Sequence, residues 1–207
     1  AGDVDLVYLG PLTEQGQLKA IERLRPHRER LLDLIEAGTA FLFTHNALEV
    51  LGERIRNDEM GYDMPGLGIF ELESTLSMFG RYNGKVMGTL AEVGARAPVV
   101  GYKSQFSTVT ASDALPGFLD AERGIGRNPG TSVEGVRRGN FLGTSLLGPL
   151  LITNPQLSRW LLATIDPDSE PVLAHEALAM AAYEARLRDF RDAKRWHPFE
   201  RVTAPRR

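Results

Sequence analysis

The stretch FLFTHNALEVLG, residues 41–52, has the pattern of a strand, a sharp turn and the beginning of a helix. Its first three residues form a short apolar run, and apolar residues return at helical spacing after the turn. Enzymes that use a nucleophile elbow place Ser or Cys at the tip of such a turn. Here the turn holds Thr44, His45 and Asn46, so the sequence predicts an elbow without the usual nucleophile.

His45 itself allows two interpretations. Because imidazole titrates near neutral pH, it can act as a base, as a ligand or in place of a catalytic residue. It can equally be a hydrogen-bonded polar residue at the start of a helix. Both interpretations fit the residues alone.

Other residues are weaker candidates for chemistry. Glu71 and Glu73 stand two apart on an expected strand and would share one face, which suits either acid–base work or a solvated surface. GIGRN at 124–128 lacks the spacing of common phosphate-binding motifs, so a turn is favoured. The chain has no cysteine and no G-x-S-x-G, and nothing near its four histidines supplies convergent ligands. We therefore predict no metal site and no cofactor.

The composition is that of an ordinary globular domain. The chain has 207 residues, 43% of them hydrophobic and 25% charged, and its net charge of −3 gives no reason to expect nucleic acid as a partner. No apolar run approaches the ~20 residues of a membrane span, and no signal-peptide pattern is visible, so we expect a cytoplasmic location. We predict a single domain over residues 1–192 and a basic C-terminal tail over 193–207.

Strands and helices alternate in the first part of the chain. Residues 4–9 and 40–43 are short apolar runs that predict buried strands. Residues 13–38 have helical spacing with a break expected at Pro26, and a further helix is expected to run from the elbow to about Arg54. This order indicates an α/β fold in which a mostly parallel sheet carries helices on both faces.

The middle of the chain has a different pattern. Apolar and polar residues alternate between Gly-rich turns at 66–75, 83–90 and 97–109, which predicts an antiparallel extension of the sheet. Asn83-Gly84 is typical of a tight hairpin turn. Residues 112–132 are rich in Gly and Pro and predict an exposed, partly mobile connection. Helical spacing returns at 154–165 and 170–192.

The order of several segments resembles a class I glutamine amidotransferase domain. The segments are DVDLVYLGPLTEQ (3–15), IEAGTAFLFTHNALEVLGERI (35–55), MPGLGIFELEST (64–75), RYNGKVMGTL (81–90), VVGYKSQFSTV (99–109) and GIGRNPGTSVEGVRRGNFLGTSLLGPLLITNPQLSRWLL (124–162). They are most similar to the cobyric-acid-synthase-like (CobB/CobQ-type) branch and, within it, to the glutaminase subunits of lipid II isoglutaminyl synthases. The resemblance covers about residues 3 to 192 and implies a flavodoxin-like three-layer sandwich. The family's first strand and helix have no counterpart before Ala1, so we expect the first βα unit to be missing.

In this family a Cys at the elbow attacks the glutamine carboxamide, a His takes its proton, and backbone N–H groups hold the oxyanion. The resemblance puts the nucleophile position on His45 and the base position, within GTSLLGPLL, on Leu147. The oxyanion loop after the first strand reads Gly10-Pro11-Leu12, in which the proline lacks an N–H donor. Neither catalytic residue of the family is therefore intact in this chain.

The same resemblance supplies candidates for ligand binding. A Glu and a His of the family's substrate-side motif fall on Lys103 and Gln105, and an arginine that positions glutamine corresponds to Arg81. The candidates to contact a ligand are Asn46, Glu49, Arg81, Gln105 and Gly10.

Loss of both catalytic residues beside an intact scaffold favours a catalytically degenerate subunit. The resemblance implies that such a subunit binds a synthetase partner of the Mur-ligase type in a structural or regulatory role. One alternative is a re-purposed enzyme, or a sensor of glutamine or a related small molecule, that uses His45, Glu49 and Arg81. Another is a glutaminase subunit of a cobyric-acid-synthase-like complex in cobalamin synthesis, or of a complex that amidates cell-wall peptidoglycan.

Overall fold

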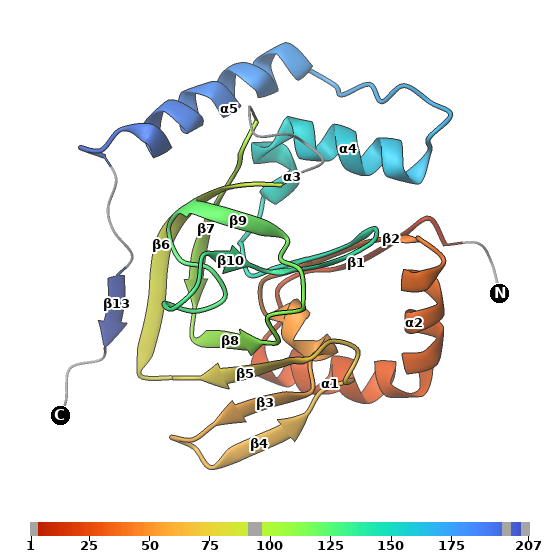
Figure 1. The fold of residues 1–207 in the computed structure, drawn as a ribbon, viewed down its shortest axis with the longest axis vertical. Coiled ribbons are helices and arrows are strands. Elements are labelled where there is room, and N and C mark those ends of the chain that lie inside the picture. The colour runs from red at the N-terminus through yellow and green to blue at the C-terminus, as the bar shows by residue number, and fades with distance from the viewer. Residues whose placement is uncertain (1–3, 91–96, 196–199, 204–207) are drawn as a thin grey trace.

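The computed structural model describes residues 4–90, 97–195 and 200–203, and its centre is a four-stranded sheet, sheet A (Figure 1). The strands of sheet A, in spatial order, are β1 (Leu6–Leu9), β2 (Ala40–Thr44), β12 (Phe141–Thr144) and β11 (Val136–Arg138). The first three run parallel, and β11 pairs antiparallel with β12. The two apolar runs at 4–9 and 40–43 thus form neighbouring parallel strands, as predicted.

Helices cover both faces of sheet A, which gives the expected three layers (Figure 1). One face carries α1 (Glu14–Leu24), the 3-10 turn η1 (Arg25–His27) and α2 (Arg28–Glu36), and the other carries α3 (Leu150–Thr153) and α4 (Pro155–Ile165). Successive residues of a strand point to opposite faces. Phe41 and Phe43 accordingly pack in the core with α1 and α2, whereas Ala40 and Leu42 pack with Leu157 of α4. Burial on both faces explains why β2 is a continuous apolar run.

The break predicted at Pro26 is confirmed. The proline lies in η1, between α1 and α2, because its ring cannot continue an α-helix and it has no N–H to donate. After α2 the chain turns at Gly38, whose φ of 83° is left-handed. The turn brings the chain directly into β2.

The helix expected to run from the elbow to about Arg54 is wrong in type and in length. The segment is a 3-10 helix, η2 (His45–Leu51), followed by Gly52 in an extended conformation. A Cβ at Gly52 would lie 2.7 Å from the Leu72 carbonyl oxygen, and this carbonyl accepts a hydrogen bond from Glu53 N–H. Gly52 therefore lies where a side chain would meet Leu72, and the chain continues from it directly into β3.

Two further sheets extend the fold below and beside sheet A. Sheet B has the order β4-β3-β5-β8, with β3 and β5 parallel and the other pairs antiparallel. In sheet C, β6 pairs with β7, β9 and β13, and β9 pairs with β10. The strands are β3 (Arg54–Asn57), β4 (Tyr62–Pro65), β5 (Leu72–Leu76), β6 (Gly80–Thr89), β7 (Val99–Gln105), β8 (Ser107–Ala111), β9 (Leu119–Arg123), β10 (Val133–Glu134) and β13 (Glu200–Thr203). The antiparallel extension is thus larger than the sequence indicated.

Two expectations about this extension are wrong. Asn83-Gly84 forms no turn, since both residues lie inside β6 and are paired with β7 on one side. The connection expected over residues 112–132 is wrong in part: much of it is exposed, but it contains β9, and Phe118 and Arg127 are buried. The Arg127 guanidinium holds this segment by donating to the carbonyls of Leu115 and Gly135.

The last long helix, α5 (Glu176–Arg191), packs against sheet C. Tyr183, Leu187 and Phe190 form a small core with Met87 of β6 and Val100 of β7. Within the predicted basic tail over 193–207, β13 pairs antiparallel with the first half of β6, and residues 196–199 and 204–207 lie outside the described residues. The α/β three-layer fold is confirmed, while the division into a domain and a tail stays a prediction.

Candidate functional site

The elbow forms where β2 ends. His45 has a φ of 57°, a left-handed conformation that it shares with one other non-glycine residue of the described chain, His175. Such a conformation costs a residue with a side chain about 1–3 kcal/mol and persists only where the surrounding structure fixes it. The strand before His45 and the 3-10 helix after it impose the conformation here. The sharp turn predicted from FLFTHNALEVLG is therefore present.

The imidazole of His45 lies between two oxygen acceptors. Its Nε2 is 3.0 Å from the Ser104 carbonyl oxygen, and its Nδ1 is 3.2 Å from Asn46 Oδ1. The orientation of the Asn46 amide is fixed by the loop after β1. Asn46 Oδ1 accepts from Leu12 N–H and Asn46 Nδ2 donates to the Leu12 carbonyl, each at 2.9 Å. Rotating the amide by half a turn would break both bonds.

This arrangement decides what His45 can do. A neutral imidazole has one N–H and one lone pair, and both ring nitrogens here face oxygens that can only accept. The lone pair of either neutral tautomer is thus directed at an oxygen acceptor. The ring lies between Asn46 and the Ser104 carbonyl of β7. The Leu12 N–H donates to Asn46 Oδ1. Leu12 lies in the loop that corresponds, by the resemblance, to the oxyanion loop of the family.

Glu49 is a buried carboxyl in the same site. It accepts hydrogen bonds from the Ser107 hydroxyl and from Gln17 Nε2, the latter at 3.0 Å. Burial raises the pKa of Glu49, and the bonds from Ser107 and Gln17 and the charge of His45 oppose this rise in part. Gln17 also donates to the Asn46 carbonyl, so α1 and the elbow are tied together.

A cavity of about 280 Å³ lies beside the elbow. It is lined by Leu12, Thr13, Glu14, Gln17, His45, Asn46, Glu49, Leu76, Arg81, Ser104, Gln105, Phe106 and Ser107. The Arg81 guanidinium lies over the Phe106 ring, 4.7 Å from its centroid, and Gln105 Nε2 donates to the Ser107 carbonyl. The structure therefore brings together four of the five predicted ligand candidates, and Gly10 is not among the lining residues.

Sequence reasoning missed five polar residues of this cavity, which are Thr13, Glu14, Gln17, Ser104 and Ser107. Gln17 lies in an amphipathic helix, where a buried polar residue looks like a surface residue, and it reaches Glu49 across 32 positions. Ser104 and Ser107 flank Gln105 at the junction of β7 and β8. The motif match that gave Gln105 as a candidate also covers Ser104 and Ser107. It is the signal in the sequence that could have indicated these two serines.

Leu147, at the base position, does not line the elbow cavity. Its N–H donates to the Tyr102 carbonyl at 2.9 Å, and it borders a separate depression of about 210 Å³ with Lys85 and Phe190. His45 contacts the Ser104 carbonyl and Leu147 contacts the Tyr102 carbonyl, both in β7. These two carbonyls are two residues apart, which is about 7 Å along the strand. The assignment of Leu147 to the base position stays a prediction, and a leucine side chain has no group that accepts a proton.

Lys103 lies in the core, outside the cavity. It is fully buried, its Nζ is 3.3 Å from Glu134 Oε1, and it donates to the Gly126 carbonyl at 2.6 Å. Burial lowers the pKa of Lys103, and the attraction of Glu134 opposes this. Lys103 therefore forms an internal ion pair and does not line the elbow cavity.

The remaining candidates contribute nothing to the elbow. Glu71 and Glu73 border a shallow depression on sheet B, outside the elbow cavity. Among residues 4–90, 97–195 and 200–203, no three His, Asp or Glu side chains are grouped so as to hold a metal ion. No helix in the same part of the chain is long and apolar enough to span a membrane.

Comparison with known proteins supports the interpretation of the motifs. The chain is 26% identical over 160 residues to the Staphylococcus aureus (strain N315) protein lipid II isoglutaminyl synthase (glutamine-hydrolyzing) subunit GatD. The match covers 77% of this chain and 63% of that subunit, so the chain spans less than two thirds of its relative's length. A crystal structure of a glutamine amidotransferase matches 77% of each chain with a TM-score of 0.49 and 16% identity. No model of a known protein family matches the sequence. The chain is thus similar to glutamine amidotransferases of the GatD type, as its motifs indicated.

Proposed function

We propose that this chain is a glutamine amidotransferase-like subunit that does not hydrolyse glutamine and that acts by binding a synthetase partner of the Mur-ligase type. The observation that carries the proposal is the environment of His45, whose two ring nitrogens both face fixed acceptors. In a ring held in this way the one lone pair of the neutral imidazole faces a fixed oxygen, so it is not directed at a substrate as that of a nucleophile or base would be. Leu147 cannot replace the missing base, and losing members of a catalytic unit typically costs orders of magnitude in rate.

The partner is inferred from the relative. GatD is by its name a subunit of a synthase, and a subunit without chemistry can still be retained for its contact surface. The same name favours cell-wall amidation over cobalamin synthesis as the setting. The role assigned here is structural or regulatory, and the cytoplasmic location expected from the sequence stays a prediction.

Glutamine hydrolysis tests the first half of the proposal. Ammonia release is measured for the purified chain alone and with the Mur-ligase-like protein encoded closest to it. We expect no release above the enzyme-free blank, and the same result for His45→Ala. Ammonia release by the wild-type chain that is abolished in His45→Ala would contradict the proposal. The double variant His45→Cys with Leu147→His shows whether restoring the two side chains restores hydrolysis.

Complex formation tests the second half separately. Size-exclusion chromatography of the mixed proteins should give a complex with wild type and with His45→Ala alike, because the proposed role needs no chemistry at the elbow. Failure to bind any Mur-ligase-like protein of the same organism would contradict the partner while leaving the absence of hydrolysis intact.

A second candidate function is the binding of glutamine or a related small molecule without turnover. It is favoured by one observation, the convergence of Asn46, Glu49, Arg81 and Gln105 on a single preformed cavity. Calorimetric titration with glutamine should then give heat that is lost in Arg81→Met, whereas the absence of heat with the wild type would exclude glutamine as the ligand. The re-purposed enzyme with His45 as base is less favoured, because the ring nitrogens are engaged.

A further inference from the structure

A second cavity lies at the opposite end of sheet A from the elbow. It has a volume of about 680 Å³ and is lined by Ile69, Phe70, Glu71, Ala114, Leu115, Pro116, Arg137, Arg138 and Gly139, which we call the distal cleft. The elbow follows the last residue of β2, whereas Arg138 and Gly139 precede the first residue of β12. Because β2 and β12 are parallel and in register, the two cavities lie near opposite ends of the same strands. They share no lining residue.

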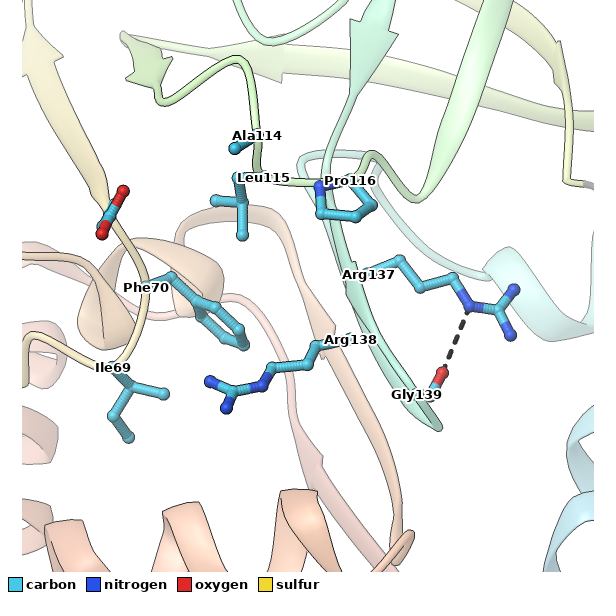
Figure 2. Close-up of a pocket in the computed structure, with 9 residues that line it drawn as sticks. Ile69, Phe70, Ala114, Leu115, Pro116, Arg137, Arg138 and Gly139 are labelled. Atoms are coloured by element: carbon cyan, nitrogen blue, oxygen red, sulfur yellow. Dashed lines mark hydrogen bonds between the residues drawn. The ribbon is translucent and has the colours of Figure 1, made fainter.

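The floor of the distal cleft is apolar and rigid. Ile69 and Phe70 are only 7% and 3% exposed, and Leu115 and Pro116 form the facing wall (Figure 2). The Phe70 ring lies 4.7 Å from the Phe141 ring, which packs on the aromatic residues of β2. A floor continuous with the main core does not need to reorganise before a ligand enters.

One cation faces this floor. Arg137 and Arg138 are neighbours on β11 and their side chains extend in opposite directions (Figure 2). Arg137 donates to the Gly139 carbonyl and lies over the Trp160 ring, away from the floor. Arg138 extends toward Phe70, so its guanidinium is the positive group beside the apolar surface.

The present partner of Arg138 is exchangeable. Arg138 Nη2 is 3.0 Å from Glu36 Oε1, and the two side chains are 45% and 62% exposed. Ion pairs as exposed as this one contribute about 0–1 kcal/mol, because water screens them. A carboxylate held on the apolar floor is less solvated and can bind the planar guanidinium through two parallel hydrogen bonds. Such a ligand can therefore displace Glu36.

We propose that the distal cleft binds a small monocarboxylate with a compact apolar body. The apolar body lies on Phe70 and Leu115, and the carboxylate binds Arg138. A cavity of this volume is in the range of small-molecule sites, about 300–1,000 Å³. Glu71, exposed on the opposite rim, disfavours a second negative charge on the ligand.

Three probes of one shape test the proposal. They are 4-phenylbutanoate, the neutral 4-phenylbutan-1-ol and the cationic 4-phenylbutylamine, each titrated into the wild-type chain. Methyl NMR spectra report binding at Ile69 and Leu115, with the methyl groups of Leu157, in the core on the other face of sheet A, as an internal reference. We expect the carboxylate to bind most tightly and to shift the two cleft methyl groups.

Two substitutions with opposite expected effects on the affinity for the carboxylate test the role of Arg138. Arg138→Met keeps the stem and removes the charge, and it should weaken binding of the carboxylate by about tenfold. Glu36→Gln removes the competing carboxylate and should tighten binding by up to about fivefold. Arg30→Met, an exposed residue of α2 outside the cleft, is the matched control and should change nothing.

The opposite results would overturn the proposal. They are an alcohol or amine that binds as tightly as the carboxylate, shifts that do not include Ile69 and Leu115, or an Arg138→Met variant with wild-type affinity. The same spectra show whether each variant is folded, so a loss of binding through unfolding cannot be mistaken for loss of the charge.

Discussion

Replacing Lys103 by Met is expected to lower the free energy of unfolding by about 3–5 kcal/mol, because it leaves a buried carboxylate without its cation. Lys103 and Glu134 are both 0% exposed, with 3.3 Å between their charged atoms. Glu134 would keep hydrogen bonds from the Thr144 hydroxyl and the Ser145 N–H, at 2.7 and 2.8 Å, which hold its carboxylate in the core. A domain is stabilised by about 5–15 kcal/mol in total, so the variant should lose a large part of its stability.

Urea unfolding followed by circular dichroism measures this loss. Lys103→Met, Glu134→Gln and the double variant form a cycle, in which the double variant should lose about 1–3 kcal/mol less than the two single losses added together. The reason is that it contains neither an unpaired Lys103 ammonium nor an unpaired Glu134 carboxylate. Lys19→Met, an exposed lysine on α1, is the control. A loss below about 1 kcal/mol in Lys103→Met, or strictly additive losses, would refute the reasoning.

Three further predictions concern the elbow and the core. The pKa of Glu49 is raised in the folded chain above its ordinary value of 4.5. Between the ordinary and the folded pKa, the native state binds more protons than the unfolded state, so the stability falls as the pH rises. Glu49→Gln should therefore gain stability relative to wild type as the pH rises from about 4 to 8, and a pH-independent difference in urea midpoints would contradict this. Gly135 and Gly61 both have a φ of 64°, but a Cβ at Gly135 would lie 2.1 Å from the Gly143 carbonyl oxygen whereas one at Gly61 meets nothing within 4 Å. Gly61→Ala should thus cost about 1–2 kcal/mol and Gly135→Ala clearly more, and equal losses in thermal melts would show that crowding is not the cause. Phe141→Ala, which removes the ring that contacts Phe41, Phe43 and Phe70, should cost about 3–5 kcal/mol by urea unfolding.

Local patterns predicted the elements that depend on near neighbours in the sequence. The apolar run at 40–43 predicted a buried strand and Pro26 predicted a helix break, because each acts through its own backbone or side chain. The close approach of Leu72 to Gly52 at the end of η2 could not be predicted in this way, since it depends on the fold.

Interactions between distant segments account for the other errors. Asn83-Gly84 has the composition of a turn, but pairing of β6 with β7 keeps it extended. The sequence placed Lys103 in a substrate-side motif, whereas the fold pairs it with Glu134 in the core. At the elbow, the family motifs indicated His45 and four further residues that line the cavity, whereas the contacts of His45 with Ser104 and Asn46 depend on the folded arrangement.

If the chain does not hydrolyse glutamine, as proposed above, the geometry of His45 explains how the elbow can remain without that reaction. A left-handed, non-glycine residue costs about 1–3 kcal/mol, and in an enzyme that cost is offset by the use made of the exposed tip. Here each of the two ring contacts contributes about 0.5–1.5 kcal/mol, and their sum is similar to the free-energy cost of the left-handed conformation. The turn is therefore close to neutral for stability with histidine at its tip. Under the proposed function, the left-handed turn at His45 would not be selected against. The His45 side chain that stabilises this turn is also the side chain that stands in place of the family's nucleophile.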